Sequence, residues 1–408
     1  MTLRKVALQM SSYSEKAFPD LPWVPQPEQQ ANMSESLLWT QEFAGHCLRS
    51  ADVEKIAQRC KELISNSSLH FDNLDELLDS CISALLVGNL VLQGPPGTGK
   101  TTLARILSSA FDTIAYETTA TSEWSTYDVV GGLAPNVSGG LEPAHGAYTR
   151  AAIACADVVR TETSTQHDHQ AVWLLIDEFN RADIDKAIGS LYTLLSSTDP
   201  DHLSKTPLEL WFERDPDARR LWVPARFRII GTMNDLDTNY VNSISQGLKR
   251  RFSFVTIPAA APDQSPAGAV GPEVALAYDQ AIEWYDRCYV TGKGPTSVIG
   301  FAGEATEHAQ VMQLQVQNVV AKLRRGSSEV RGWPVGSAQV VDVMKYLVLG
   351  GTEKDMSARL DAAVAERLVA QFENLSEVQL DAFLKILEDS GLPKSVRALQ
   401  HIYNPYAL

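Results

Sequence analysis

Short apolar runs and amphipathic stretches alternate through the middle of the chain. Each run is followed by glycines or polar residues, and the runs lie at 89–93, 172–176, 227–232 and 252–257. Between the runs, apolar residues recur with helical spacing at 101–110, 148–160, 184–196 and 241–248. Strands of this length that alternate with helices predict an α/β fold, in which helices pack against a parallel sheet.

The flanking parts of the chain show other patterns. Residues 1–32 are proline-rich and aperiodic, whereas residues 34–66 and 74–86 have helical spacing. Beyond an Ala/Pro/Gly-rich linker, only helical periodicity is found, at 272–289, 304–322, 337–349, 355–372 and 376–389. We therefore expect three parts, which are a small, mostly helical N-terminal region (1–73), an α/β core (74–258) and an all-α domain (259–408).

Two polar segments interrupt the predicted core, near 122–148 and 198–226. Glycine pairs at 131–132 and 139–140 flank a short polar stretch, which predicts a β-hairpin or a projecting loop. Four aromatic residues of these segments either contact a substrate or pack locally, namely Trp124, Tyr127, Trp211 and Trp222.

The first apolar run leads into a glycine-rich turn and then into a helix. Residues 94–101 match the pattern G-x-x-x-x-G-K-[ST], in which backbone N–H groups wrap a phosphate because no Cβ intrudes. Lys100 would reach the β- and γ-phosphates, and Thr101 would ligate Mg²⁺. The strand before the turn and the helix after it favour a phosphate loop over an ordinary surface turn. The predicted nucleotide-binding residues are Gly94, Pro95, Pro96, Gly97, Thr98, Gly99, Lys100, Thr101 and Thr102.

Two further strands end in groups suited to nucleotide hydrolysis. The strand at 172–176 is followed by Asp177, which can hold the Mg²⁺ shell, and by Glu178, which can polarise the attacking water. The strand at 227–232 delivers Asn234 to the same edge of a parallel sheet, where it could orient that water. Ordinary surface acids at the end of a buried strand are the alternative for the two carboxylates.

The composition limits the classes of function. A net charge of −15 argues against a broad basic face for nucleic acid, although a local basic channel is compatible with it. No apolar run approaches the roughly 18 residues of a membrane span, and the N-terminus lacks a secretory apolar core, so we expect a cytoplasmic protein without membrane contact. The five scattered cysteines suggest neither a disulfide framework nor a zinc knuckle, and residues 167–169 (His-Asp-His) are expected to form a solvated loop rather than a metal site.

These residues together resemble the AAA+ ATPases. Residues 176–182 (Ile-Asp-Glu-Phe-Asn-Arg-Ala), 230–234 (Ile-Gly-Thr-Met-Asn) and 248–252 (Leu-Lys-Arg-Arg-Phe) resemble the McrB branch of the MoxR/McrB clade. The predicted hairpin is similar to that clade's insert within the second helix, and the segment before residue 227 lies where the group carries a β-hairpin. The resemblance implies a P-loop AAA+ core followed by an α-helical lid, and it leaves out the first 70 residues.

The resemblance also implies how the protein works. ATP and Mg²⁺ would be its cofactors, Glu178 and Asn234 would be catalytic, and six subunits would close into a ring. Arg250 or Arg251 of one subunit would then reach the γ-phosphate held by its neighbour, a contact that can raise the rate by several orders of magnitude. The alternative for these arginines is a solvated helix end, which the helix dipole favours.

Two stretches depart from the pattern of these relatives. McrB proteins that prefer GTP carry a run after Met-Asn that residues 235–239 (Asp-Leu-Asp-Thr-Asn) do not reproduce, so ATP is the expected nucleotide. Many MoxR relatives place a lid arginine near a Ser-Pro-Arg-Ala motif, whereas residues 334–338 read Pro-Val-Gly-Ser-Ala. Arg331 is the candidate substitute for that arginine.

Three functions remain open at the level of sequence. The leading hypothesis is a McrB-like motor that couples ATP hydrolysis to translocation or remodelling of a partner, works with a separate effector such as a nuclease, and reaches nucleic acid through the partner or the pore. The first alternative is a MoxR-like chaperone that remodels a protein partner, which the acidic composition favours. The second is a nucleotide-gated assembly switch. A nuclease in the neighbouring reading frame would support the motor, and a von Willebrand-type domain there would support the chaperone.

Overall fold

The computed structural model describes most of the chain from residue 45 onwards. The described ranges are 45–49, 52–65, 67, 69, 71, 73–137, 139–162, 169–234, 244–258, 270–289, 305–327, 330, 332–349, 356–372 and 375–403. The predictions made for residues 1–32, 167–168, 235–239 and Arg331 lie outside the described residues. The chain divides into two compact units, a first unit of Met1–Leu63, Leu74–Gln93 and Lys100–Thr256 and a second unit of Ile64–Asn73, Gly94–Gly99 and Ile257–Leu408.

A five-stranded parallel sheet forms the centre of the first unit and confirms the α/β prediction. The strand order is β2-β5-β8-β1-β9. The bounds are β1 (Asn89–Gly94), β2 (Thr113–Thr119), β5 (Ala171–Asp177), β8 (Ile229–Asn234) and β9 (Phe252–Thr256). The sequence pattern did not predict β2, because this edge strand is only partly buried and lacks an apolar run. The other four strands lie where apolar runs predicted them.

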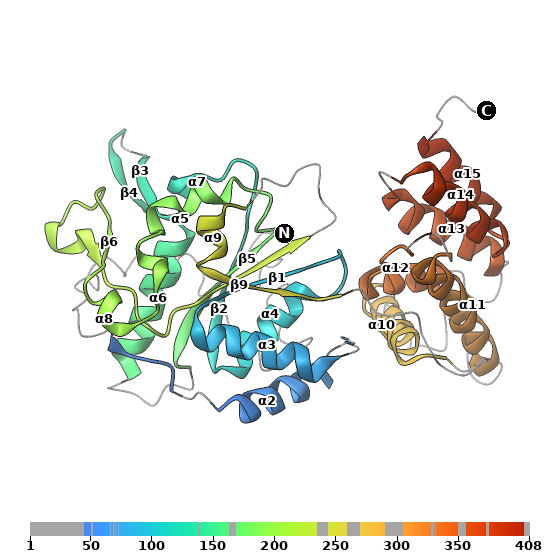
Figure 1. Ribbon diagram of the computed structural model, residues 1–408, viewed down its shortest axis with the longest axis horizontal. Coiled ribbons are helices and arrows are strands. Elements are labelled where there is room, and N and C mark those ends of the chain that lie inside the picture. Colours follow the sequence, from blue (N-terminus) through green and yellow to red (C-terminus); the bar gives the residue numbers. More distant parts are fainter. Residues whose placement is uncertain are drawn as a thin grey trace. The chain divides into compact units, whose positions relative to one another are not determined.

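Helices cover both faces of this sheet, as Figure 1 shows. The helix that follows β1, α4 (Lys100–Ala110), packs on β2, β5 and β8, and α3 (Leu74–Val87) contacts β9. Helix α6 (Ala147–Glu162) packs on β5 from the opposite face. This is the arrangement expected of right-handed crossovers, because the chain runs towards β2 after β1 and back from β2 afterwards.

Aromatic side chains fill the core between the sheet and its helices. Trp173 on β5 is fully buried, its ring centroid lies 5.0 Å from that of Phe111, and its indole N–H donates to the Arg226 carbonyl at 2.8 Å. Phe179, just beyond β5, packs against Phe252 with ring centroids 5.4 Å apart. The aromatic core thus extends up to the edge of the sheet where β5 ends.

The predicted helix at 184–196 is broken in the structure. Helix α7 spans only Ile184–Ile188, and two 3₁₀ turns follow, η3 (Gly189–Leu191) and η4 (Leu194–Ser196). Gly189 lowers helix propensity at the break. In addition, Tyr192 is held by bonds outside the segment, since its carbonyl accepts a hydrogen bond from Arg251 at 2.7 Å.

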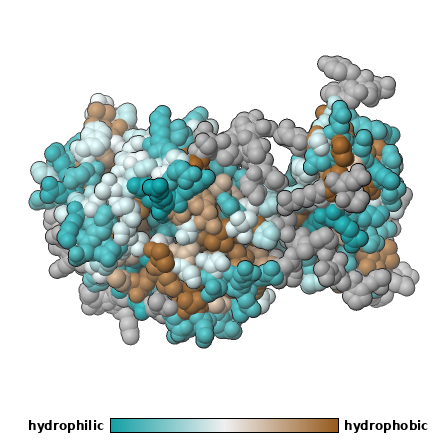
Figure 2. Space-filling model, in the orientation of Figure 1, coloured by the Kyte–Doolittle hydropathy of each residue, from teal (hydrophilic) through white to brown (hydrophobic). Residues whose placement is uncertain are grey.

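Both predicted insertions contain antiparallel strands. The hairpin predicted from paired glycines is confirmed by β3 (Gly131–Pro135) and β4 (Leu141–His145), which follow the short helix α5 (Thr126–Val129). The second insertion holds α8 (Pro200–Leu203), β6 (Leu208–Glu209), η5 (Pro216–Arg219) and β7 (Arg220–Leu221). Figure 2 shows hydrophobic surface over the β3–β4 hairpin, where Leu133, Val137 and Leu141 are exposed.

The start of the described chain is tied to the first unit by arginines. Arg59 on α2 (Val53–Ser65) forms a two-bond ion pair with Asp112, and the Arg226 Nε donates to the Cys47 carbonyl at 2.7 Å. Arg228 is buried, and its Nε donates at 2.7 Å to the Leu85 carbonyl near the end of α3. The described residues before Ile64 therefore belong to the same unit as the sheet.

The second unit is built from six described helices around its own apolar core. They are α10 (Pro272–Tyr289), α11 (Ala305–Arg325), α12 (Ser337–Val348), α13 (Met356–Arg367), α14 (Glu377–Glu388) and α15 (Pro393–Tyr403). Trp333 packs on Phe372 and Phe383, with ring centroids 4.6 and 6.4 Å away. Helix α15 was not predicted, whereas the five helices before it were. Among the described residues, no helix combines the length and the apolar character that crossing a membrane requires.

The burial of the cysteines gives a prediction for thiol chemistry. Burial raises the pKa of Cys60, Cys81 and Cys155 to about 12, whereas Cys47 and Cys288 are exposed. Because the thiolate is the reactive form, we expect two of the five thiols to react rapidly with Ellman's reagent at pH 8 in the native protein. All five should react in denaturant, and a variant with Cys47→Ser and Cys288→Ser should show no fast phase. A third fast thiol in the native wild type would contradict the described packing.

Candidate functional site

The site lies where three neighbouring strands of the sheet end. Strands β5, β8 and β1 are adjacent and parallel, so their carboxyl ends share one edge. The chain leaves β1 at Gly94, β5 at Asp177 and β8 at Asn234. Ligands of open parallel sheets bind outside this edge. The topology therefore gathers residues that are far apart in the sequence, such as Asp177 and Asn234, which are 57 positions apart.

The glycine-rich turn has the backbone of a phosphate loop. Gly97 and Gly99 have φ angles of 76° and 81°, a left-handed backbone conformation that residues with a Cβ rarely adopt. The hydroxyl of Thr98 donates to the Pro95 carbonyl at 3.0 Å and closes the turn. Lys100, the first residue of α4, is buried despite its charge. A buried lysine beside a left-handed glycine turn is the arrangement that anionic phosphate requires.

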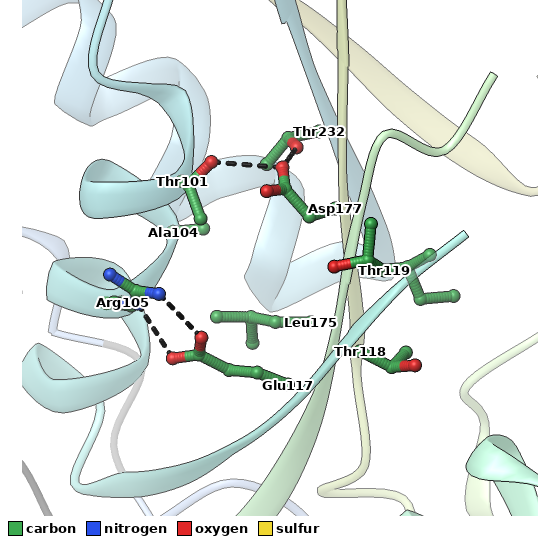
Figure 3. Close-up of a pocket in the computed structure, with 10 residues that line it drawn as sticks. Thr101, Ala104, Arg105, Glu117, Thr118, Thr119, Leu175, Asp177 and Thr232 are labelled. Atoms are coloured by element: carbon green, nitrogen blue, oxygen red, sulfur yellow. Dashed lines mark hydrogen bonds and ion pairs between the residues drawn. The ribbon is translucent and has the colours of Figure 1, made fainter. Parts of the chain in front are cut away.

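Asp177 forms the centre of a group of oxygen atoms at the end of β5. Its Oδ1 accepts a hydrogen bond from the Thr101 hydroxyl at 3.0 Å and another from the Thr232 hydroxyl (Figure 3). These residues come from α4, β5 and β8. One carboxylate and one hydroxyl are hard oxygen donors, and Mg²⁺ is commonly bound by such a pair together with water and substrate phosphates. The residues present therefore fit a magnesium ion.

A cavity of about 150 Å³ adjoins this group. Figure 3 shows Thr101 and Asp177 at one end of it and the pair Arg105 and Glu117 at the other. Two hydrogen bonds of 2.7 Å join Arg105 on α4 to Glu117 on β2, and the bond to Glu117 raises the pKa of Arg105 above its ordinary value. Strand β2 pairs with β5, which carries Asp177. This ion pair therefore ties the helix that carries Thr101 to the strand beside Asp177.

Glu178 is held in a strained conformation next to Asn234. Its φ of 55° is left-handed, which is uncommon for a residue other than glycine and costs about 1–3 kcal/mol that the surrounding contacts have to offset. The side-chain amide of Asn234 donates to both carboxylate oxygens, at 3.3 and 3.4 Å. The guanidinium of Arg181 lies 3.4 Å from the same carboxylate. The strand β5 thus turns sharply at Glu178 and presents the carboxylate to β8.

Asn180 holds Asn234, the partner of Glu178, in place. It is buried, and its side-chain N–H donates to the Asn234 carbonyl at 2.9 Å. Its Oδ1 is also buried and accepts no hydrogen bond from the part of the chain that the structure describes. Asn180 therefore fixes the position of the Asn234 backbone at the end of β8.

The two arginines after helix α9 (Gln246–Lys249) differ in their environment. Arg251 donates at 2.7 Å to the Tyr192 carbonyl and at 2.5 Å to the Gly247 carbonyl, and its guanidinium lies 4.3 Å from the centroid of the Tyr192 ring. Arg250 is exposed, and its side chain makes no hydrogen bond or ion pair with the described residues. Intrachain contacts therefore occupy Arg251 and leave Arg250 accessible.

A second cluster holds the start of α9 in place. Asp185 accepts hydrogen bonds from the Tyr192 and Ser245 hydroxyls and, at 2.9 Å, from the Ser245 backbone N–H. Burial raises the pKa of Asp185, but these hydrogen bonds outweigh it, and the pKa lies below its ordinary value. An ionised Asp185 thus ties α7 to the residue that caps α9.

The two insertions are joined to one another rather than separate. The His145 imidazole on β4 lies 2.5 Å from the Glu213 carboxylate, and Arg214 donates to the Leu141 carbonyl at 2.6 Å. Of the aromatic residues singled out in the sequence, Trp211 and Tyr127 are exposed, whereas the Trp222 indole donates to the Ser204 carbonyl at 3.2 Å. Local packing therefore accounts for Trp222.

The structure brings Thr101, Asp177, Glu178 and Asn234 to one edge of the sheet, as the strand order requires. Pro95 and Pro96 lie in the turn with Gly94 and Gly97, and Thr102 lies on α4 after Thr101. Sequence reasoning missed Thr232, Arg105 and Glu117. The available signal for Thr232 was its place two residues before Asn234 on the same strand, whereas Glu117 lies on the strand that the pattern did not reveal.

Comparisons with known proteins agree with this geometry. Residues 89–252 match the family model of the AAA domain (dynein-related subfamily). The chain is also 28% identical over 178 residues to the "Type IV methyl-directed restriction enzyme EcoKMcrB subunit" of Escherichia coli (strain K12). That match covers 41% of this chain and 35% of the relative, so the chain spans about a third of the curated relative that it matches.

The bond from Thr232 to Asp177 gives a prediction for metal dependence. Thr232→Val removes a hydrogen bond that orients the carboxylate, and loss of such a partner typically weakens metal binding by about 10–100-fold. We expect the Mg²⁺ concentration for half-maximal nucleotide hydrolysis to rise by that factor. Thr118→Val, which changes a neighbouring residue of the same cavity, is the matched control. An unchanged Mg²⁺ requirement in Thr232→Val would show that Thr232 does not orient a metal ligand.

Proposed function

We propose that this chain, an AAA+ protein of the McrB type through its domain at residues 89–252, hydrolyses ATP with Mg²⁺ as one subunit of a ring. The match of residues 89–252 to the AAA domain family supports nucleotide hydrolysis. The observation that carries the proposal is the convergence of Thr101, Asp177, Glu178 and Asn234 at one sheet edge, together with the left-handed glycine turn that comes just before Thr101 in the chain.

Each residue of this edge has a distinct role in the proposed reaction. The backbone N–H groups of Gly97, Thr98 and Gly99 and the ammonium of Lys100 bind the phosphates, and Thr101 and Asp177 hold the metal. Bound Mg²⁺ would neutralise charge on the β- and γ-phosphate oxygens. Glu178 accepts a proton from the attacking water, and Asn234 orients that carboxylate and the water.

Glu178→Gln tests this assignment of roles. Glutamine has nearly the same shape and can still accept a hydrogen bond from Asn234, but it cannot take up the proton. We expect ATP affinity to be preserved and the turnover number to fall by about 10²–10⁴-fold, measured by phosphate release and by equilibrium binding. A variant that turns over at the wild-type rate would remove Glu178 from the chemistry.

We propose further that the ring is homo-oligomeric, of six subunits, and that Arg250 acts on the nucleotide of the neighbouring subunit. Three observations support Arg250 over Arg251. The Arg250 side chain is exposed and makes no hydrogen bond or ion pair with the described residues, Arg251 is engaged by Tyr192 and Gly247, and the preceding helix is anchored through Ser245. Arg251 would then be a positioning residue that holds the end of α9.

Mixed rings distinguish these roles. Arg250→Ala should lower ATP turnover by about 10³-fold or more, as loss of a trans arginine does in related reactions. When added to the wild type, it should depress activity more than in proportion to its share, because each variant subunit also disables a neighbour. Lys249→Ala, an exposed cation one residue earlier, is the matched control and should leave turnover unchanged. Strictly proportional loss in the mixture would argue against a shared site.

The partner that we propose is a separate effector subunit, with the chain acting as its motor. Support comes from the similarity to a relative whose name describes one subunit of a restriction enzyme. The net charge of −15 fits contact with nucleic acid through the effector or a local channel rather than through a broad surface of this chain.

A further inference from the structure

The segment that leads into helix α12 lies against the phosphate loop, and both belong to the same compact unit. The Ala338 N–H donates to the Gly97 carbonyl at 3.2 Å. A Cβ built on Gly336 would lie 2.8 Å from the carbonyl carbon of Gly97 and would overlap the carbonyl oxygen of Pro96. Glycine at position 336 is therefore what lets the first turn of α12 approach this closely.

The bond from Ala338 fixes the direction of one peptide group in the phosphate loop. In a trans peptide, the carbonyl and the N–H of the next residue point in opposite directions, and the described chain contains no cis peptide bond. Since the Gly97 carbonyl faces α12, the N–H of Thr98 faces away from it. Phosphate loops bind their ligand through such N–H groups. The contact thus holds one donor in a fixed direction in advance.

A buried ion pair holds the approaching segment on both sides of Gly336. Arg324 at the end of α11 makes two hydrogen bonds, of 2.6 and 2.8 Å, to the Glu273 carboxylate on α10. The guanidinium also donates twice to the Val335 carbonyl, at 2.9 and 2.7 Å. The Ser337 hydroxyl donates to Glu273 at 2.7 Å. Val335 and Ser337 are the residues that flank Gly336, so the pair fixes its position directly.

The Arg324–Glu273 ion pair matters for the position of the segment around Gly336 more than for the stability of the fold. The Arg324 side chain is only 4% exposed, and a buried ion pair is often no more stabilising than well-packed apolar residues. Its clear effect is directional, because a guanidinium offers donors in a rigid fork. Here the donors of Arg324 are shared between the Glu273 carboxylate and the backbone carbonyl of Val335, the residue before Gly336.

We infer that Gly336 and the Arg324–Glu273 pair are positioning elements of the nucleotide site, which seat α12 on the phosphate loop and orient a loop N–H towards bound phosphate. The inference rests on the proposed nucleotide binding by residues 94–101. Linkage makes the effect reciprocal, so nucleotide in the loop also stabilises the first turn of α12.

Gly336→Ala tests the inference in the full chain. The added methyl displaces α12 from Pro96 and Gly97, and we expect the dissociation constant of a fluorescent ADP with Mg²⁺ to rise about tenfold, the usual scale for a hydrogen bond to a charged group. Gly189→Ala is the matched control, since a Cβ there meets nothing within 4 Å, and its affinity should equal that of the wild type.

The effect of ADP on amide hydrogen exchange is a quantity that a purely structural role of Gly336 would not change. In the wild type, ADP should slow exchange of the amides at 337–340, and Gly336→Ala should lose this nucleotide-dependent part. Glu273→Ala should behave like Gly336→Ala. Glu273→Gln keeps one acceptor oxygen, which can still serve Ser337 and one N–H of Arg324, and loses the other, so it should recover part of the affinity.

The outcomes separate this inference from the proposed function. If the wild type binds no nucleotide, both are wrong. If the wild type binds ADP and Gly336→Ala binds it equally well, only the positioning role is overturned. Faster exchange in α12 that is equal with and without ADP, at unchanged affinity, would likewise reduce the contact to local packing.

Discussion

The Asp177 carboxylate is the point on which the rest of the site depends. It accepts hydrogen bonds from hydroxyls of α4 and β8 while lying at the end of β5, so it fixes three separate elements relative to one another. A carboxylate that must satisfy both hydroxyls has little freedom to move. The ion pair of Arg105 and Glu117 reinforces the same arrangement from the neighbouring strand. Metal ligands that are held in this way need little reorganisation when an ion binds.

Strain at Glu178 depends on this rigidity. The next residue, Phe179, is packed in the aromatic core, and the Phe179 N–H donates to the Thr232 carbonyl at 2.8 Å. With Asp177 held before it and Phe179 held after it, the chain between them has to adopt the left-handed conformation. The result is a carboxylate that faces Asn234 instead of continuing along β5. The fold thus imposes at this position a geometry that glutamate would not choose in a free chain.

A common principle connects the remaining polar clusters of the molecule. Arg251 and Asp185 anchor the short helix that precedes Arg250, and Arg324 and Glu273 anchor the segment that carries Gly336. In each case a charged pair or network holds the residues next to the position proposed to act. Short helices and loops have little intrinsic stability, so fixed hydrogen bonds have to supply the precision that such positions need.

The sequence by itself determined the strands β1, β5, β8 and β9, the glycine turn and the residues at the strand ends, because apolar runs and the phosphate-binding pattern are local properties. It did not reveal the edge strand β2, since a partly buried strand needs no apolar run, nor the break after Ile188, which bonds to Arg251 help to impose. Only the tertiary structure distinguished Arg250 from Arg251 and brought Gly336 to Gly97. Those relations depend on contacts between residues far apart in the chain, and no local pattern encodes them.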